Sequence, residues 1–246
     1  MTEYDRTGWR QVGACLILLA SCGMIASSFS IIAVPLSEEF KPSRMVLMLA
    51  MTAMSGVTAL LSPMTGNLLD RYSMRSLMLI GSAFIVSGFL ALSFAESFTQ
   101  VLLIYGLLMA PASIFLGPMA ATVLLSRWFV ERRGRALGIA FAGLSVGSFV
   151  FPPLTQALID THDWRGGLRL LALTLGICTV PAALLIVGRP ADRSLEGEGT
   201  AAPVQAAGST AAAPLSSRAI LSDPTFWLIA AVLTAAMAGM KGMVTN

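Results

Sequence analysis

Charged residues, cysteine and histidine are scarce in this sequence. Asp, Glu, Lys and Arg make up only 12% of its 246 residues, and there are three cysteines and one histidine. Water-soluble domains carry about 25% charged residues, so the composition excludes an ordinary soluble protein. The cysteines (Cys15, Cys22 and Cys178) and His162 lack the spacing of metal ligands. We therefore expect no zinc site and no cofactor.

Apolar residues are correspondingly abundant, at 56% of the chain, and the mean hydropathy is +0.78. The hydrocarbon core of a bilayer is about 30 Å thick, and an α-helix crosses it with about 20 apolar residues. A segment in lipid has to satisfy its own backbone hydrogen bonds, so long apolar runs are expected to be helical. Six runs have the required length and a seventh is shorter: Val12–Leu36, Met45–Thr65, Leu77–Ala95, Val101–Leu125, Ala136–Ile159, Leu168–Gly188 and Phe226–Met240.

These runs predict an all-α membrane protein with four regions. Residues 1–11 are a cytoplasmic N-terminus, and residues 12–189 are a bundle of six helices. Residues 190–222 are rich in Ala, Gly, Ser, Thr and Pro, which is the composition of a flexible loop. Residues 223–246 begin with the helix-start signal Asp223-Pro224 and hold an incomplete seventh helix.

The positive charges are concentrated on one side of the predicted bundle. The net charge of +3 alone would also suit a nucleic-acid-binding protein. Cytoplasmic loops of membrane proteins carry an excess of Lys and Arg, and an inside N-terminus satisfies that rule. We therefore expect a multi-pass protein of the plasma (inner) membrane, in contact with the lipid bilayer and not with nucleic acid. The cytoplasmic set is Arg6, Arg10, Arg71, Arg75, Arg127, Arg132, Arg133, Arg135, Arg189, Arg193 and Arg218; the other set is Lys41, Arg44, Arg165, Arg169 and Lys241.

The N-terminus has an alternative interpretation. Arg6 and Arg10, followed by an apolar run that includes Leu19-Ala20-Ser21-Cys22, are also compatible with a lipoprotein signal peptide. The apolar run continues past Cys22 to Leu36, and further spans follow it. We therefore expect the first helix to be retained.

A charged loop separates the second and third apolar runs. It has a glycine, an aspartate four residues later and then two arginines. A hairpin between membrane helices needs polar residues, but it does not need this spacing. The stretch resembles the loop between helices 2 and 3 of the major facilitator superfamily, written G-x-L-a-D-r-x-G-r-k. The matching residues are Gly66, Leu68, Asp70, Arg71 and Arg75, whereas Ser73 and Met74 differ from the pattern.

A second stretch, Trp128 to Gly143, resembles a narrower group in that superfamily. It is similar to the pattern aromatic-Phe-x-Lys-Arg-Arg-x-Leu-Ala-x-Gly-x-Ala-x-Ala-Gly of monocarboxylate porters and bacterial oxalate/formate exchangers; Glu131 and Arg135 depart from it. The resemblance implies the N-terminal bundle of a twelve-helix carrier, built as a 3+3 inverted repeat, with a partial seventh helix and without the C-terminal bundle. It also implies alternating-access transport of a small organic anion such as a monocarboxylate, by uniport, proton symport or exchange.

A weak internal repeat agrees with an inverted-repeat bundle. Asp70 and Arg75 have the same spacing as Asp160 and Arg165, which lie 90 residues further along the chain. Three helices separate the two pairs, as a 3+3 repeat requires. Charged residues also occur in loops by chance, so the spacing alone is weak support.

The resemblance also suggests a reversible cytoplasmic gate. In the family, the residue matching Asp70 contacts a helix N-terminus of the second bundle, and Arg133 and Arg135 are the candidates to bracket it. Ion pairs at a membrane edge suit a gate because each contributes only about 0.3–2 kcal/mol. The alternative is that the arginines only set topology. The candidate gate residues are Gly66, Asp70, Arg71, Arg75, Arg132, Arg133 and Arg135.

Small and hydroxyl-bearing residues complete the candidate sites. Small residues four apart let membrane helices approach closely, and two glycine pairs have this spacing, Gly134 with Gly138 and Gly143 with Gly147. An ionisable residue at mid-depth is the usual pointer to a proton relay, and the first six runs hold none. By analogy with the family, the polar candidates to line a cavity are Ser21, Ser28, Tyr105 and Ser113. Membrane serines also bond their own backbone, so a purely local role is the alternative.

Two functional classes remain open. The first is a secondary active transporter that is truncated after its first bundle. The second is a non-transporting membrane protein, either a truncated product or an interaction partner. An enzyme is not expected, because no nucleophile, base or metal cluster lies at membrane depth.

Overall fold

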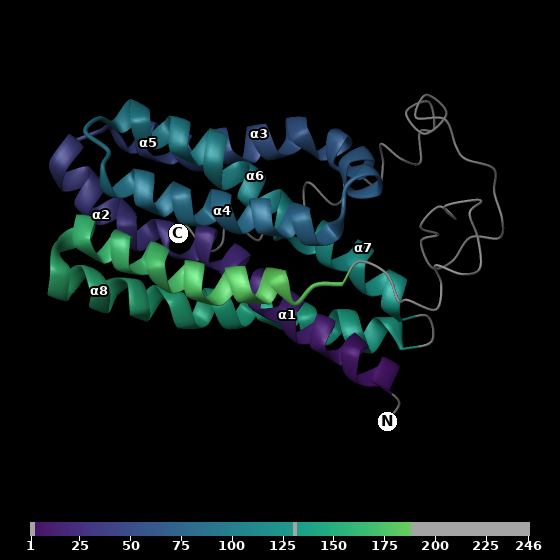
Figure 1. Ribbon diagram of the computed structural model, residues 1–246. Helices are drawn as coiled ribbons and strands as arrows, with labels where there is room; N and C mark the ends of the chain where they lie inside the picture. Colours follow the sequence, from purple (N-terminus) through teal and green to yellow (C-terminus); the bar gives the residue numbers. More distant parts are fainter. Residues whose placement is uncertain (1–2, 130–131, 188–246) are drawn as a thin grey trace. The chain divides into compact units, whose positions relative to one another are not determined.

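The computed structural model of the chain describes residues 3–129 and 132–187 (Figure 1). Every regular element in these ranges is helical. The expected linker 190–222 and incomplete seventh helix 223–246 lie outside the described residues. The helices are α1 (Glu3–Ser27), α2 (Phe29–Phe40), α3 (Arg44–Arg71), α4 (Met74–Ser93), α5 (Phe98–Ile104), the π-helical turn η1 (Tyr105–Met109), α6 (Ala110–Phe115), α7 (Pro118–Trp128) and α8 (Arg133–Leu184).

Within residues 3–129 and 132–187, five helical stretches are long and apolar enough to cross a membrane. The most apolar 18-residue windows have mean hydropathies between 1.7 and 2.2, which confirms the expected all-α membrane class. The stretches are Arg6–Phe40, Met45–Gly66, Met74–Ser93, Phe98–Trp128 and Arg133–Leu184.

The last stretch, α8, is too long for one straight span. Its 52 residues would extend about 78 Å at 1.5 Å per residue, more than twice the hydrocarbon thickness. The backbone leaves the helical region at His162 (φ −135°, ψ 20°) and Asp163 (φ 62°, ψ 162°). Figure 1 shows the chain reversing in α8, so that residues 133–161 (the first arm) and 164–184 (the second arm) run in opposite directions.

Two other stretches are interrupted within the apolar zone. The first stretch changes from α1 to α2 at Ser28. The fourth contains η1 and a break between α6 and α7, where Pro118 begins α7. Proline is favoured in a first helical turn because its missing N–H has no intrahelical partner there. A Cβ on Gly117 would overlap the carbonyl oxygen of Ser113, so this break requires glycine.

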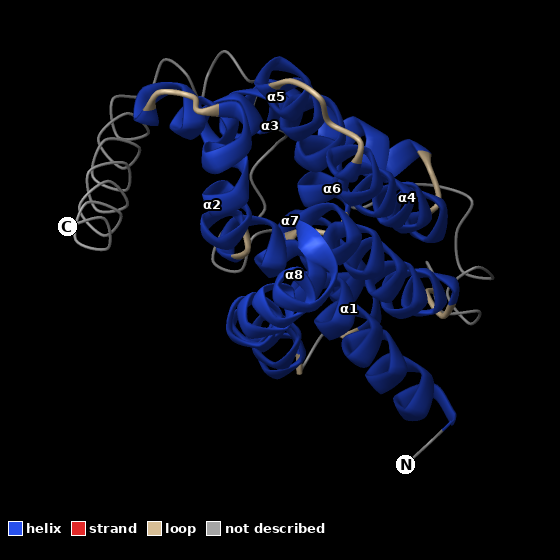
Figure 2. Cartoon of the chain, turned by 90° about the vertical axis from the view of Figure 1, so that its left-hand side faces the viewer, coloured by secondary structure: helices blue, strands red, loops and turns tan. Residues whose placement is uncertain are grey.

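The helices pack in two neighbouring groups (Figure 2). In one group α1 packs against α8. Helix α4 joins the two groups, because it packs against the second arm of α8 and also against α6 and η1. In the other group α3 packs against the segments α5, η1 and α6. Of residues 45–66 in α3, only Ala50 and Thr65 are buried, so most of this span presents its side chains outward.

Candidate functional site

The signature loop closes with an ordinary helix cap. Helix α3 ends at Arg71, and Ser73 is the N-cap of α4. The hydroxyl of Ser73 accepts a hydrogen bond from the Ser76 backbone N–H at 3.1 Å, which satisfies one free donor of the new helix. The φ of Ser73 is −67°. A serine therefore fits where the family pattern has its second glycine, because no left-handed backbone is needed here.

The charged residues of the loop lie at the ends of α3 and α4. Arg71 and Arg75 are exposed. Gly66 lies within α3, and an added Cβ would meet no atom within 4 Å. The expected contacts of the Asp70 side chain lie outside the described residues. The structure thus presents Arg71 and Arg75 to the surroundings and leaves space over Gly66.

A different arginine attaches the loop to the fourth stretch. Arg127 of α7 donates from Nη2 to the carbonyl oxygen of Leu69 at 3.3 Å, and Leu69 is buried. Sequence reasoning used Arg127 only for topology. Its position before the family motif of residues 128–143 was the available signal, but nothing in the spacing pointed to a main-chain acceptor in α3.

The expected arginine bracket lies at the start of α8. Arg132 and Arg135 are exposed, and Arg133 is half-buried. The guanidinium of Arg135 lies 5.8 Å from the ring centroid of Trp9. That ring in turn packs edge-on against Phe129 at 5.6 Å. The motif of residues 128–143 is thereby joined to the start of α1.

A buried amide ties the same end of the bundle together. Gln11, which is 1% exposed, donates from Nε2 to the Leu185 carbonyl and accepts at Oε1 from the Val187 N–H, each at 3.1 Å. Trp128 donates from Nε1 to the Val187 carbonyl at 2.9 Å. These bonds satisfy backbone groups just beyond α8 that have no helical partner. Sequence reasoning missed Gln11, which is the polar residue just before the first apolar run.

The four glycines of the first arm divide into two kinds. A Cβ on Gly143 would overlap the Leu16 carbonyl oxygen, and one on Gly147 would overlap that of Ala20. The backbones of α1 and α8 therefore touch at these points. A Cβ on Gly134 or Gly138 would meet nothing within 4 Å, so these two are not at a close contact.

The four expected cavity liners lie apart and have protein contacts. Ser21 donates to the Ile17 carbonyl at 3.1 Å, and Ser113 donates to the Ala110 carbonyl at 2.7 Å. Tyr105 is 1% exposed and packs edge-on against Phe29 at 5.3 Å. The Ser28 hydroxyl lies 3.3 Å from that of Thr155 in the first arm of α8, and both are buried. Ser28 alone of the four thus has a hydroxyl partner on a distant helix.

An open hollow lies on the first arm of α8. It measures about 460 Å³ and is lined by Leu144, Ser145, Ser148 and Phe149. Ser148 also donates to the Gly23 carbonyl of α1 at 3.4 Å. Sequence reasoning did not single out these residues, because serine and phenylalanine are common in membrane helices.

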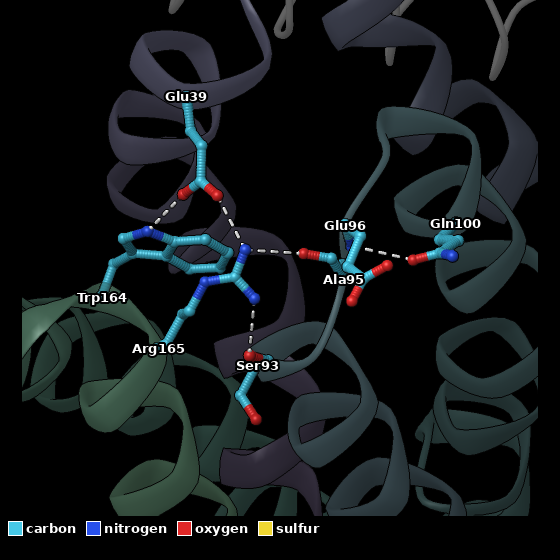
Figure 3. A network of polar contacts seen from close by, with 7 residues as sticks. All are labelled: Glu39, Ser93, Ala95, Glu96, Gln100, Trp164 and Arg165. Carbon is cyan, nitrogen blue, oxygen red and sulfur yellow. Dashed lines mark hydrogen bonds and ion pairs between the residues drawn. The ribbon is translucent and has the colours of Figure 1, made fainter.

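A polar cluster lies at the opposite end of the bundle, where α2, α4 and α8 meet (Figure 3). Arg165 Nη2 is 2.7 Å from Glu39 Oε1, and Trp164 Nε1 donates to Glu39 Oε2 at 2.8 Å. Arg165 also donates from Nη1 to the Ser93 carbonyl at 3.1 Å and from Nη2 to the Ala95 carbonyl at 2.9 Å. We call these five residues the Arg165 cluster. The repeat of Asp70–Arg75 in Asp160–Arg165 pointed to this arginine, but nothing in the sequence pointed to Glu39.

Arg169 extends the contacts one turn further along α8. Its Nε donates to the Ser93 hydroxyl at 3.3 Å, and its guanidinium lies 4.6 Å from the Phe94 ring centroid. Among the described residues, no group of three or more His, Cys, Asp or Glu side chains is placed to hold a metal ion.

Known proteins resemble the chain over most of its length. Monocarboxylate transporter 4 of Rattus norvegicus is 29% identical over 182 residues, which cover 72% of this chain and 38% of that protein. The fujikurins efflux protein of Gibberella fujikuroi is 34% identical over 146 residues, covering 58% and 31%. Monocarboxylate transporter 13 of Rattus norvegicus is 34% identical over 138 residues, covering 55% and 32%. The chain thus spans between three and four tenths of the length of these relatives.

The family comparison covers more of the chain than any of these relatives. The model of the Major Facilitator Superfamily matches residues 14–245, which include both signature stretches, most of the membrane-capable stretch Arg6–Phe40 and the whole of the four stretches that follow it. The sequence resemblance, the helical membrane fold and the transporter relatives therefore agree. The chain is a multi-pass membrane protein that belongs to the Major Facilitator Superfamily of transporters.

Proposed function

We propose that the chain is the first bundle of a secondary active transporter that carries a small organic solute by alternating access. A monocarboxylate or a related organic anion is the proposed solute. The observation that carries the proposal is the Arg127–Leu69 hydrogen bond. It joins the loop of residues 66–75 to the residue directly before the stretch of residues 128–143, so the two family motifs lie near each other at one end of the bundle.

The proposed bundle has six spans in a 3+3 inverted repeat, with the two arms of α8 counted separately. An offset of 90 residues supports this count. The reversal at residues 72–73 corresponds to the reversal at 162–163, and the break at Ser28 corresponds to Pro118 at the start of α7. The packing supports it as well, because α1 against the first arm and the fourth stretch against α3 are repeat-related pairs. Inverted repeats of this kind are common in secondary transporters.

The proposed orientation puts the N-terminus in the cytoplasm of a cell whose plasma (inner) membrane the bundle spans. Arg71, Arg75, Arg127, Arg132 and Arg135 lie at the end of the bundle where α1 begins. An excess of arginine favours the cytoplasmic side. The Arg165 cluster then faces the outside.

The proposed cytoplasmic gate uses the signature loop. Arg71 and Arg75 are exposed, and Gly66 has open space over it. These features suit a surface that a second bundle approaches and leaves. Asp70 is the proposed contact to that bundle, with Arg132, Arg133 and Arg135 beside it. A C-terminal bundle is therefore the proposed principal partner, together with the lipid bilayer.

The proposed solute class rests on the relatives. Two of them are named monocarboxylate transporters, and one is named a fujikurins efflux protein. The described spans have no Asp, Glu, Lys, Arg or His side chain at mid-depth, so the proposed source of a positive group for an anion is the second bundle. This bundle would contribute hydroxyls to the solute, from Ser21, Ser28, Tyr105 and Ser113 or from the hollow at Ser145 and Ser148.

Uptake by vesicles tests the proposal. The full-length protein that contains this chain is reconstituted, and uptake of radiolabelled short monocarboxylates is compared with that of empty vesicles. The Asp70→Asn variant should lose uptake. Asp160→Asn, which changes the repeat-related exposed aspartate at the other end, should retain it.

The opposite results would contradict the proposal in separable ways. Uptake equal to that of empty vesicles for all monocarboxylates tested would reject the solute class and favour a non-transporting or interacting membrane protein. Undiminished uptake by Asp70→Asn would reject the gate and leave transport intact.

A further inference from the structure

Helix α2 is a separate short helix that follows α1 in the same membrane-capable stretch. Helix α1 ends at Ser27, and α2 runs from Phe29 to Phe40 with Pro35 inside it. Proline has no N–H, so the Ile31 carbonyl lacks its usual helical donor and the segment is weakened there. The segment buries one narrow face, made of Phe29, Ile32, Ala33 and Leu36. Its opposite face is exposed.

The base of α2 is held in place at Ser28. The hydroxyl of Ser28 lies 3.3 Å from that of Thr155, and both side chains are buried. Thr155 also donates to the Phe151 carbonyl at 2.8 Å. A hydrogen bond between buried hydroxyls is costly to leave unmade in an apolar surrounding, so this contact is the fixed end of the segment.

At the tip of α2, Glu39 is the charged side chain that holds the helix in place among the described residues. Both carboxylate oxygens are used, one by Arg165 and one by Trp164. The side chains of Arg165 and Glu39 are 33% and 39% exposed. Water can therefore compete for the carboxylate, and an ion pair at such a site is reversible.

Arg165 stays in position without Glu39. Its guanidinium donates to the carbonyls of Ser93 and Ala95 at the end of α4, where the helix dipole favours a cation. It also lies over the Trp164 ring, 4.5 Å from the centroid. Three contacts thus hold Arg165 in place, and Glu39 is the partner that can detach from it (Figure 3).

We propose that Glu39 is a latch: it holds the tip of α2 against Trp164 and Arg165, and its release lets α2 swing about Ser28 and uncover its buried face. The partner of the latch is the reversal of α8 together with the end of α4. Release exposes the space beneath α2, at the end of the bundle opposite to the N-terminus. Glu39 is a positioning residue in this device and makes no contact with the solute.

Cysteine labelling measures this release directly, in the intact chain in detergent and without any transport assay. Cys15, Cys22 and Cys178 are replaced by alanine, and a single reporter cysteine is introduced by Ala33→Cys. Ala33 is 7% exposed on the buried face of α2, so a maleimide reacts with it only when the segment opens. Ala172→Cys, at a 2% exposed position in the second arm, reports general loosening.

Glu39→Gln removes the charge and one acceptor while keeping the side-chain shape. It should raise the labelling rate of the Ala33→Cys reporter about two- to fivefold, which is the change in a two-state equilibrium expected from the loss of a partly exposed ion pair. The rate of the Ala172→Cys reporter should not change. Glu38→Gln is the matched control, because Glu38 is the exposed neighbour with no charged partner among the described residues. Trp164→Phe removes a single donor and should give a smaller increase than Glu39→Gln.

Two outcomes overturn the latch. One is a labelling rate for the Ala33→Cys reporter that Glu39→Gln leaves unchanged. The other is an equal rise at both reporters, which means general unfolding instead of a swing of α2. Because neither readout involves a solute, failure of the latch is distinguishable from failure of the proposed transport.

Discussion

Arg127 Nη2 donates to the backbone carbonyl of Leu69 at 3.3 Å. The bond crosses from the end of α7 to the end of α3, 58 positions earlier in the chain. It fixes the start of the signature loop through a main-chain atom, so the loop position does not depend on which residue stands at 69. A loop that has to meet and leave a second bundle benefits from such a rigid base.

Removing this anchor should destabilise the loop. Arg127→Gln is expected to lower the free energy of unfolding by about 1.5–3 kcal/mol, because a hydrogen bond from a charged donor is lost. The midpoint of thermal unfolding in detergent measures the change. Arg75→Gln, at an exposed position in the same loop region, should stay within about 0.5 kcal/mol. Equal stability of the two variants would show that Arg127 does not anchor the loop.

Alanine substitutions at two glycines of α8 should have different effects on stability, because only one of the two lies at the contact with α1. Gly147→Ala puts a methyl group into the Ala20 carbonyl and should cost about 1–3 kcal/mol through overpacking. Gly138→Ala enters open space and should be neutral or stabilising by about 0.4–1 kcal/mol, because the unfolded chain loses freedom. Thermal unfolding of both variants checks this. A tolerated alanine at 147 together with a damaging one at 138 is the contrary result.

The buried side-chain amide of Gln11 should stabilise the backbone just beyond the end of α8. Gln11→Ala leaves the Leu185 carbonyl and the Val187 N–H without this partner, and each buried unsatisfied group costs about 1–3 kcal/mol. Hydrogen exchange at Val187, followed by mass spectrometry, should rise together with a lower unfolding midpoint. Gln156→Ala is the control, because Gln156 is exposed and, among the described residues, its side chain donates to the nearby Asp160 and reaches no other helix. Unchanged exchange near residue 187 would contradict the assignment.

Near the reversal of α8, glycine should stabilise the protein in place of Asp163 and destabilise it in place of Asp160. Asp163 has φ 62° and ψ 162°, a region that costs a residue other than glycine about 1–3 kcal/mol. Asp163→Gly should therefore stabilise the protein by about 1 kcal/mol, after the entropic cost of glycine is subtracted. Asp160→Gly, within the helical first arm, should destabilise it by about 0.5–1 kcal/mol. Unfolding midpoints that move in the same direction would contradict this account of the turn.

Much of the fold could be predicted from local sequence. Most of each of the first six apolar runs lies in helices of the structure, because length and hydropathy decide whether a segment crosses a bilayer. The pair Gly117-Pro118 in the fourth run is a local break signal, because proline lacks an N–H, and α7 begins at Pro118. The two family motifs identified the superfamily, and the family match over residues 14–245 confirms it.

Helix boundaries were predicted less well where backbone geometry outweighs hydropathy. The expected gap between Ile159 and Leu168 is almost entirely helical, and only His162 and Asp163 leave the helical region. Polar residues at a membrane boundary do not have to end a helix, because water satisfies their side chains while the backbone continues its hydrogen bonds. The reversal therefore takes two residues instead of a longer loop.

Sequence alone determined that this chain is helical, membrane-spanning and a member of a transporter superfamily, because those properties follow from hydropathy and short motifs. Only the tertiary structure decided which glycines of the first arm touch α1, that Arg127 reaches Leu69, and that Glu39 meets Trp164 and Arg165. Glu39 and Arg165 are 126 residues apart. Their contact depends on how each helix is rotated and how far it extends, and neither quantity is written in local hydropathy.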